Sequence, residues 1–336
     1  MSLNYFQLIK KIIEPVSNQE VPKLSAFSSR ELENMLKLAS SNRVLLILCK
    51  NIKAAGYMGI NAESSILIDK IIVSGDQINS QYAKLLKRIK NTFQENEIVF
   101  LIVKTDRKNE YVLSDVDILV KEDKFDRAKE LLGEILSDND IKDKEGRWHY
   151  KFNRKVQIDL HTTDLDWYSN EFINVDSIWE GIQERQFLGD VYKFPSAQNE
   201  WIFNALNIIY EKSTLTYLDF LFLRDNKGNA EQIKQIAKNH GWAVGLEVFN
   251  NYLAKIKKQI AGSAQQNSFM LPQMFSVGDF AQIFIARLFS PLRNYRNSGF
   301  YFCYFIYCKL RFIVTLKQRI PFYGNWFDFT NVSVRK

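Results

Sequence analysis

The stretch SDVDILV, residues 114–120, alternates apolar residues with two acids, Asp115 and Asp117. In a β-strand, residues two apart point to the same side, with Cα atoms roughly 6.5–7 Å apart. The two carboxylates therefore project together, while the apolar residues pack on the other face. Neighbouring carboxylates repel unless solvent or a cation neutralises them, and Mg²⁺ commonly binds one or two carboxylates together with substrate phosphates. The stretch predicts either a cation-binding strand or a solvated strand end.

A third acid occurs later in the chain in the same kind of setting. Asp159 lies between two apolar residues in VQIDLH, residues 156–161, and so faces away from the apolar side of that strand. Alternation from Trp148 onward, on either side of an Asn-Arg turn, predicts a β-hairpin that ends in this strand. If the strand pairs beside residues 114–120, the three carboxylates meet on one sheet face. Metal-assisted phosphoryl or nucleotidyl transfer needs such a donor set.

The hydrophobic spacing around these strands predicts an α+β fold, with a minimal mixed-sheet core flanked by N- and C-terminal helical regions. We expect three parts, over residues 1–97, 98–194 and 195–336. In the first part we expect a helix that starts at a capping box of Ser28 and Glu31, a helix that stops near Gly56, and a long helix over 66–94. In the middle part we expect a buried strand over 98–103, a helix with Asp123 as its N-cap, and a charged loop over 138–146. Helices follow from the N-cap Ser196 onward.

The composition favours partners that carry phosphate. The chain has 336 residues, a formal net charge of +7 and 46% hydrophobic residues, and a positive charge attracts nucleotides, nucleic acid or an anionic membrane surface. Its three cysteines, Cys49, Cys303 and Cys308, show no metal-binding or redox spacing. We therefore expect reduced thiols and a cytoplasmic location.

Residues 299–316 form a long apolar stretch that is interrupted by Lys309 and Arg311. Each such charge costs about 2.5–3.5 kcal/mol near the centre of a membrane span, so we expect no transmembrane segment here. Aromatic and basic residues interleave in this region, which is typical of a packed core with a basic rim. The same pattern also fits single-stranded nucleic acid binding or peripheral contact with a membrane surface.

The acidic motifs resemble those of the DNA polymerase β-like nucleotidyltransferase superfamily. SDVDILV is similar to its central acid pair, and QIDLH to its third-acid strand. More closely, the chain is similar to a branch of uncharacterised nucleotidyltransferase family proteins over residues 30–256, including the leading and trailing helices. The resemblance implies a nucleotidyltransferase-type core and a metal-dependent enzyme that moves a nucleoside monophosphate from an NTP to an acceptor. The acceptor is unidentified: RNA, protein or a small molecule.

The resemblance also implies site residues. Asp115, Asp117 and Asp159 would be the catalytic and metal-binding residues with Mg²⁺ or Mn²⁺, and Lys104, Thr105 and Ser114 would bind the nucleotide. The branch has Leu-Lys-Gly where this chain has Val-Lys-Thr at 103–105, so the glycine that lets backbone amides approach phosphates is replaced. This departure keeps a second reading open: a catalytically impaired module that binds a nucleotide or a protein partner. A basic protein that binds nucleic acid or a membrane surface is the third reading.

Four further residues are weaker candidates. His161 shares a face with Asp159 and would contact substrate, order Asp159, or be a polar edge residue. His149 could join them in a zinc site, although no cysteine or third histidine lies nearby in the sequence. Tyr217 and Asp219 are candidates for lining the cleft from the later helices.

Overall fold

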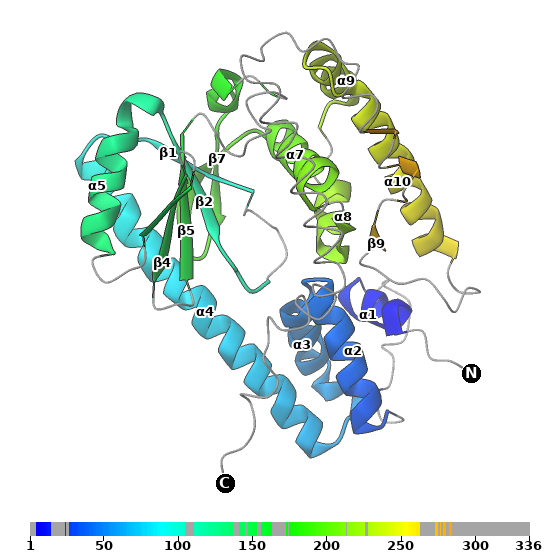
Figure 1. Cartoon of the computed structure of the whole chain (residues 1–336). Coiled ribbons are helices and arrows are strands. Elements are labelled where there is room, and N and C mark those ends of the chain that lie inside the picture. The colour runs from blue at the N-terminus through cyan, green and yellow to red at the C-terminus, as the bar shows by residue number, and fades with distance from the viewer. Residues whose placement is uncertain are drawn as a thin grey trace.

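The computed structural model describes residues 5–14, 24, 27–104, 111–136, 141–144, 147–152, 156–162, 173, 175–212, 214–225, 228–262, 273–274, 276, 278–279 and 282–283. A small mixed sheet lies in the middle of the chain, with helices before and after it in the sequence (Figure 1). The predicted α+β class is confirmed.

The front of the chain is helical, as predicted. Its elements are α1 (Tyr5–Ile13), α2 (Ser29–Ser41), α3 (Leu45–Ala54), the short 3₁₀ turn η1 (Gly56–Gly59) and α4 (Ala62–Glu95). The capping box is present, because Ser28 and Glu31 bond each other's backbone amides. Helix α3 ends just before Gly56, whose φ of 62° suits glycine. Asn61 caps α4, so the long helix starts earlier than the hydrophobic pattern indicated.

The core is a five-stranded sheet in the order β1-β2-β5-β4-β3. Its strands are β1 (Phe100–Val103), β2 (Val116–Val120), β3 (Ile141–Lys144), β4 (Arg147–Phe152) and β5 (Val156–His161). β1 is antiparallel to β2, β2 is parallel to β5, and β4 and β5 form the predicted hairpin. All residues of β1 are buried, whereas Val99 before it is 46% exposed, so the strand is shorter than the apolar run.

Two local predictions in this region were wrong. Asp123 does not cap the helix, because Glu122–Lys124 forms a 3₁₀ turn, η2, and α5 (Phe125–Ile135) begins after it with Lys124 at the N-cap. Part of the predicted charged loop is strand β3, which pairs with β4. Backbone pairing to a neighbour can form a charged edge strand without an apolar face.

A second hairpin, which the sequence reading did not identify, follows the sheet. It consists of β6 (Gln183–Phe187) and β7 (Asp190–Phe194), after the 3₁₀ turn η3 (Val175–Trp179). The Tyr192 ring lies 6.4 Å from the Phe100 ring of β1, and Asp190 pairs with Lys90 of α4 at 2.8 Å. The hairpin thus joins the sheet to the long helix.

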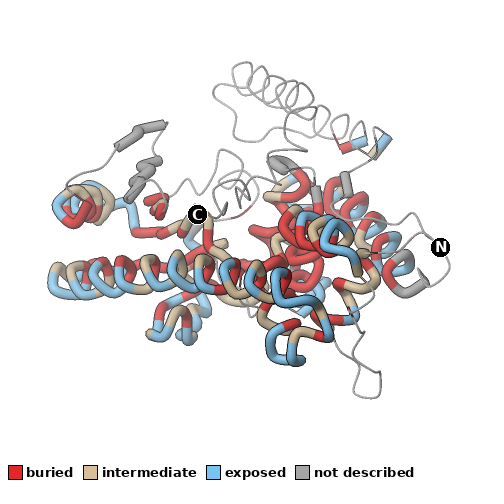
Figure 2. Tube along the Cα trace, turned by 90° about the horizontal axis from the view of Figure 1, so that it is seen from below, coloured by how far each residue is buried: buried red, intermediate tan, exposed pale blue. Residues whose placement is uncertain are grey.

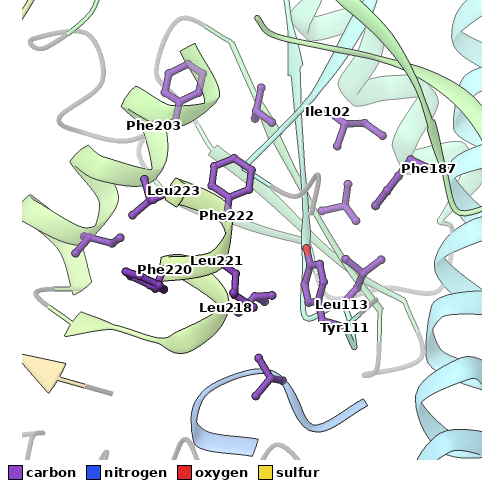
Figure 3. Packing of buried hydrophobic residues seen from close by; sticks show 14 of the residues in the cluster. Ile102, Tyr111, Leu113, Phe187, Phe203, Leu218, Phe220, Leu221, Phe222 and Leu223 are labelled. Atoms are coloured by element: carbon purple, nitrogen blue, oxygen red, sulfur yellow. The ribbon is translucent and has the colours of Figure 1, made fainter. Parts of the chain in front are cut away.

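The rest of the described chain is mainly helical. It contains α7 (Ala197–Leu206), the π-helical turn η4 (Asn207–Lys212), β8 (Thr214–Leu215), α8 (Tyr217–Asp225), α9 (Ala230–Asn239), α10 (Ala243–Gly262) and β9 (Gln273–Met274). Ser196 caps α7 as predicted. Both α7 and α8 are buried nearly throughout, and Figure 3 shows apolar side chains of α8 facing Ile102, Tyr111 and Leu113.

Helix α4 is amphipathic, with buried residues along one side and exposed residues along the other (Figure 2). The front and back helices also touch directly: Lys10 of α1 donates a hydrogen bond to the carbonyl of Ile260 in α10 at 3.1 Å. Among the residues that the structure describes, no helix combines the length and the apolar character that crossing a membrane requires. The apolar stretch 299–316 lies outside the described residues.

Candidate metal centre

Pairing between β2 and β5 brings the acids of two sequence segments together. The parallel register sets Asp117 opposite Asp159 and Leu119 opposite His161. Side chains alternate along each strand, so Asp117, Asp159 and His161 share one face while the apolar residues between them are buried on the other. One ligand atom from each of the three lies within 4.8 Å of the other two. The strand pairing on which the sequence argument depended is confirmed.

Asp117 contacts both a histidine and a lysine. Its Oδ1 lies 2.7 Å from Nε2 of His161 and 3.4 Å from Nζ of Lys104. The Lys104 and Asp117 side chains are only 11% and 13% exposed, and that of His161 is 1% exposed. Charges that are largely shielded from water interact more strongly than surface charges. Lys104, at the end of β1 with a φ of 58°, is therefore held at the acids.

Asp159 is positioned by the residue two before it and, through that residue, by helix α4. The Gln157 side-chain amide donates to Asp159 Oδ1 at 2.8 Å. The backbone N–H of Gln157 donates to the hydroxyl of Tyr82 at 3.0 Å. Burial raises the pKa of that hydroxyl, so it stays protonated at neutral pH. The long helix thus fixes the strand that carries Asp159.

Asp115 lies one residue before β2, beside the other two acids. The Ser114 hydroxyl donates to its Oδ1 at 2.5 Å. Removal from solvent raises the pKa of Asp115, and the nearby Asp117 carboxylate raises it further, with a smaller contribution from Asp159. Asp115 is thus electrostatically coupled to both acids, although it is not one of the three residues with mutually close ligand atoms.

Arg43 is a cation at this site that the sequence reading missed. Its guanidinium lies 5.6 Å from the centre of the Tyr111 ring. Its charge lowers the pKa of Asp115, as the Ser114 hydrogen bond does, and so opposes the rise caused by desolvation and by the neighbouring carboxylates. Asn42 before it is fully buried, and its side-chain oxygen accepts from the N–H of Tyr217 at 3.1 Å. Nothing in the sequence around Arg43 marks it, because its approach depends on how the α2–α3 turn packs against α8.

The other candidates divide into two groups. Thr105 and the side chain of His149 lie outside the described residues. Tyr217 and Asp219 are buried in contacts within the helices. The Tyr217 hydroxyl donates to the Glu14 carboxylate, and Asp219 accepts from the Thr216 hydroxyl at 2.7 Å. These two contacts tie helix α8 together and to the front of the chain.

The residues present fit a divalent cation. Two carboxylates and an imidazole are all metal-ligand groups. Nδ1 of His161 is buried without a hydrogen-bond partner in the part of the chain that the structure describes, and such a group calls for an explanation such as a water or an ion. Among the described residues, Lys104 pairs with Asp117 and the charge of Arg43 acts on Asp115.

Comparison with known proteins finds similarity to solved structures but not to sequence families. No protein-family model and no curated protein sequence matches the chain. The fold is similar to the crystal structure of lincosamide antibiotic adenylyltransferase LnuA with lincomycin bound. The match covers 43% of this chain and 96% of that chain, with a TM-score of 0.30 and 14% sequence identity.

Proposed function

We propose that this chain is a metal-dependent nucleotidyltransferase, which moves a nucleoside monophosphate from an NTP to an acceptor and releases pyrophosphate. The observation that carries the proposal is the β2–β5 register, which sets Asp117 beside Asp159 with ligand atoms within 4.8 Å. Two ionised carboxylates at that distance repel by about 3 kcal/mol at an effective dielectric constant near 20. A fold that holds them together gains from a bound cation, which is what such a reaction requires.

In this proposal, Asp115, Asp117 and Asp159 hold Mg²⁺ or Mn²⁺. The bound ion would neutralise charge on the NTP phosphates as it develops. Asp159, on the neighbouring strand, would also accept the proton of the acceptor hydroxyl. Its bond from Gln157 orients the carboxylate for that task.

The phosphate end of the nucleotide would lie at the cations. Lys104 contacts Asp117 at 3.4 Å from the end of β1, so it can reach both the acids and a phosphate bound to the same ion. Ser114, already hydrogen-bonded to Asp115, would position that acid and contact the nucleotide. Thr105 would contribute its N–H and hydroxyl where the family branch has glycine.

A second candidate function is a nucleotide-binding module without turnover. It is favoured by the replacement of the branch glycine by Thr105, because a Cβ restricts the close approach of backbone amides to phosphate. NTP binding with no pyrophosphate release from any of the four NTPs would select this candidate over the enzyme.

The test is a pyrophosphate-release screen with each NTP and with Mg²⁺ or Mn²⁺, in which labelled nucleotide is traced to RNA, protein or small molecules. Asp117→Asn should abolish metal-dependent NTP binding and release. Asp126→Asn, on the exposed side of α5, is the matched control and should change neither. If the Asp117 variant binds nucleotide and metal like the wild type, the assignment fails.

A further inference from the structure

We infer that His161 is a direct ligand of the divalent cation, and that its ring nitrogen makes this site select Mn²⁺ over Mg²⁺. The inference rests on the proposed function and deepens it by naming the cation. The proposed function assigns the metal to three aspartates and gives His161 no role.

The geometry places His161 where a ligand would be. Nε2 lies 2.7 Å from Asp117 Oδ1, and both are within 4.8 Å of a ligand atom of Asp159. Adjacent ligands of an octahedral ion with bonds of about 2.1 Å lie about 3 Å apart. The imidazole and the carboxylate are thus already near the spacing that a shared cation imposes. A cation that binds both atoms displaces the hydrogen between them, which passes to Nδ1 of His161 or to solvent, with little movement of either side chain.

The chemistry of the donor set then decides the metal. Mg²⁺ prefers oxygen ligands and gives up its waters reluctantly. Imidazole suits transition metals, whereas carboxylates suit Mg²⁺ and Mn²⁺ alike. A site in which the ring nitrogen of His161 replaces one oxygen ligand therefore favours Mn²⁺. The two carboxylates of the site would bind either ion.

The other ring nitrogen argues against a permanently held zinc ion. A metal-binding histidine usually donates its second N–H to an acceptor, which strengthens it as a ligand. Nδ1 of His161 is buried and lacks any hydrogen-bond partner within the described ranges. His161 is therefore a ligand of modest strength. Together with two carboxylates and no thiolate in the described cluster, this suits an exchangeable ion rather than the four-ligand sites of structural zinc.

The experiment compares Mn²⁺ and Mg²⁺ binding to the metal-free full-length chain by calorimetry and by electron paramagnetic resonance of Mn²⁺, with Mg²⁺ as competitor. His161→Gln keeps the reach of Nε2 but removes the imidazole, and should lower Mn²⁺ affinity by about tenfold with a smaller effect on Mg²⁺. His161→Glu supplies an oxygen ligand and should shift the preference towards Mg²⁺. His240→Gln, at the C-terminal end of α9, is the matched control and should leave both affinities unchanged.

A measurement on the wild type covers the case in which the variants do not fold. Pulsed paramagnetic resonance of bound Mn²⁺ should detect coupling to a ring nitrogen, and a spectrum without that coupling overturns the inference. So does an unchanged Mn²⁺ to Mg²⁺ ratio in folded His161→Gln. In either case, if Asp117→Asn abolishes the binding of both metals, the assignment of the acidic residues as a metal site still holds. If the wild type binds neither cation, the proposed function itself fails.

Discussion

Replacing Tyr82 by phenylalanine tests how helix α4 supports the acidic strand. The Tyr82 side chain is completely buried, and its hydroxyl accepts the backbone N–H of Gln157 at 3.0 Å. Phenylalanine keeps the ring and its packing but removes the acceptor, so the backbone N–H of Gln157 loses its hydrogen bond to residue 82. Leaving a buried donor unpaired costs about 1–3 kcal/mol, and we expect a loss of stability in that range.

The assay should be local, because the chain has several packed regions. Hydrogen exchange of the Gln157 amide in the Tyr82→Phe variant should be faster by roughly 5- to 150-fold, which is the same free energy expressed as an opening equilibrium. Asp159, which Gln157 orients, should bind the cation more weakly in parallel. Urea unfolding would report the global share of the effect.

Tyr192→Phe provides the matched control for this experiment. Tyr192 is also buried, but its hydroxyl has no hydrogen bond to any residue in the described part of the chain, so its removal should change stability by less than about 0.5 kcal/mol. Exchange at Gln157 that is equally slow in the wild type and in Tyr82→Phe would refute the support that we assign to α4.

Three other predictions follow from the site. Asp115→Asn should stabilise the metal-free protein at pH 7: the pKa of this acid is raised in the fold, so its ionised form opposes folding above that pKa, and the gain should vanish below the unfolded pKa of about 3.9. Thermal unfolding across pH checks this, and a destabilised variant at pH 7 would contradict it. Arg43→Gln should weaken NTP binding by about tenfold if its charge supports the phosphates, measured by calorimetry with Arg127→Gln on α5 as control; equal affinity would exclude that role. Asn42→Ala should cost about 1–3 kcal/mol in urea unfolding, because the amide of Tyr217 loses its buried acceptor, and a change within 0.5 kcal/mol would contradict that account.

Much of the local structure could be read from the sequence, because local signals have local causes. The capping box at Ser28 and the cap at Ser196 depend on a side chain that reaches an amide three residues away. The β4–β5 hairpin depends on alternation around a short turn. The predictions for Asp123 and for residues 141–144 were wrong. A 3₁₀ turn replaces the cap at Asp123, and backbone pairing with β4 makes a strand of 141–144 although its side chains show no strand pattern.

The site itself was only half predictable. The alternation of side chains along a strand predicted which face of each strand carries its acids. The acids of the two strands could meet only if the strands paired, and the parallel pairing of β2 with β5 sets Asp117 opposite Asp159. Arg43 could not be found, since it reaches the site through a turn held by a distant helix. His161 was identified as a neighbour of Asp159, but its distance to Asp117 was not accessible from spacing.

The sequence by itself determined which side chains share a face within each strand, because stereochemistry alternates side chains along extended backbone regardless of what surrounds it. Only the tertiary structure decided that β2 and β5 are parallel neighbours, that Lys104 and His161 converge on the same oxygen of Asp117, and that α4 braces β5. These are contacts between segments far apart in the chain. Their geometry depends on how the helices and the sheet pack together, and the spacing of residues within one segment does not specify that packing.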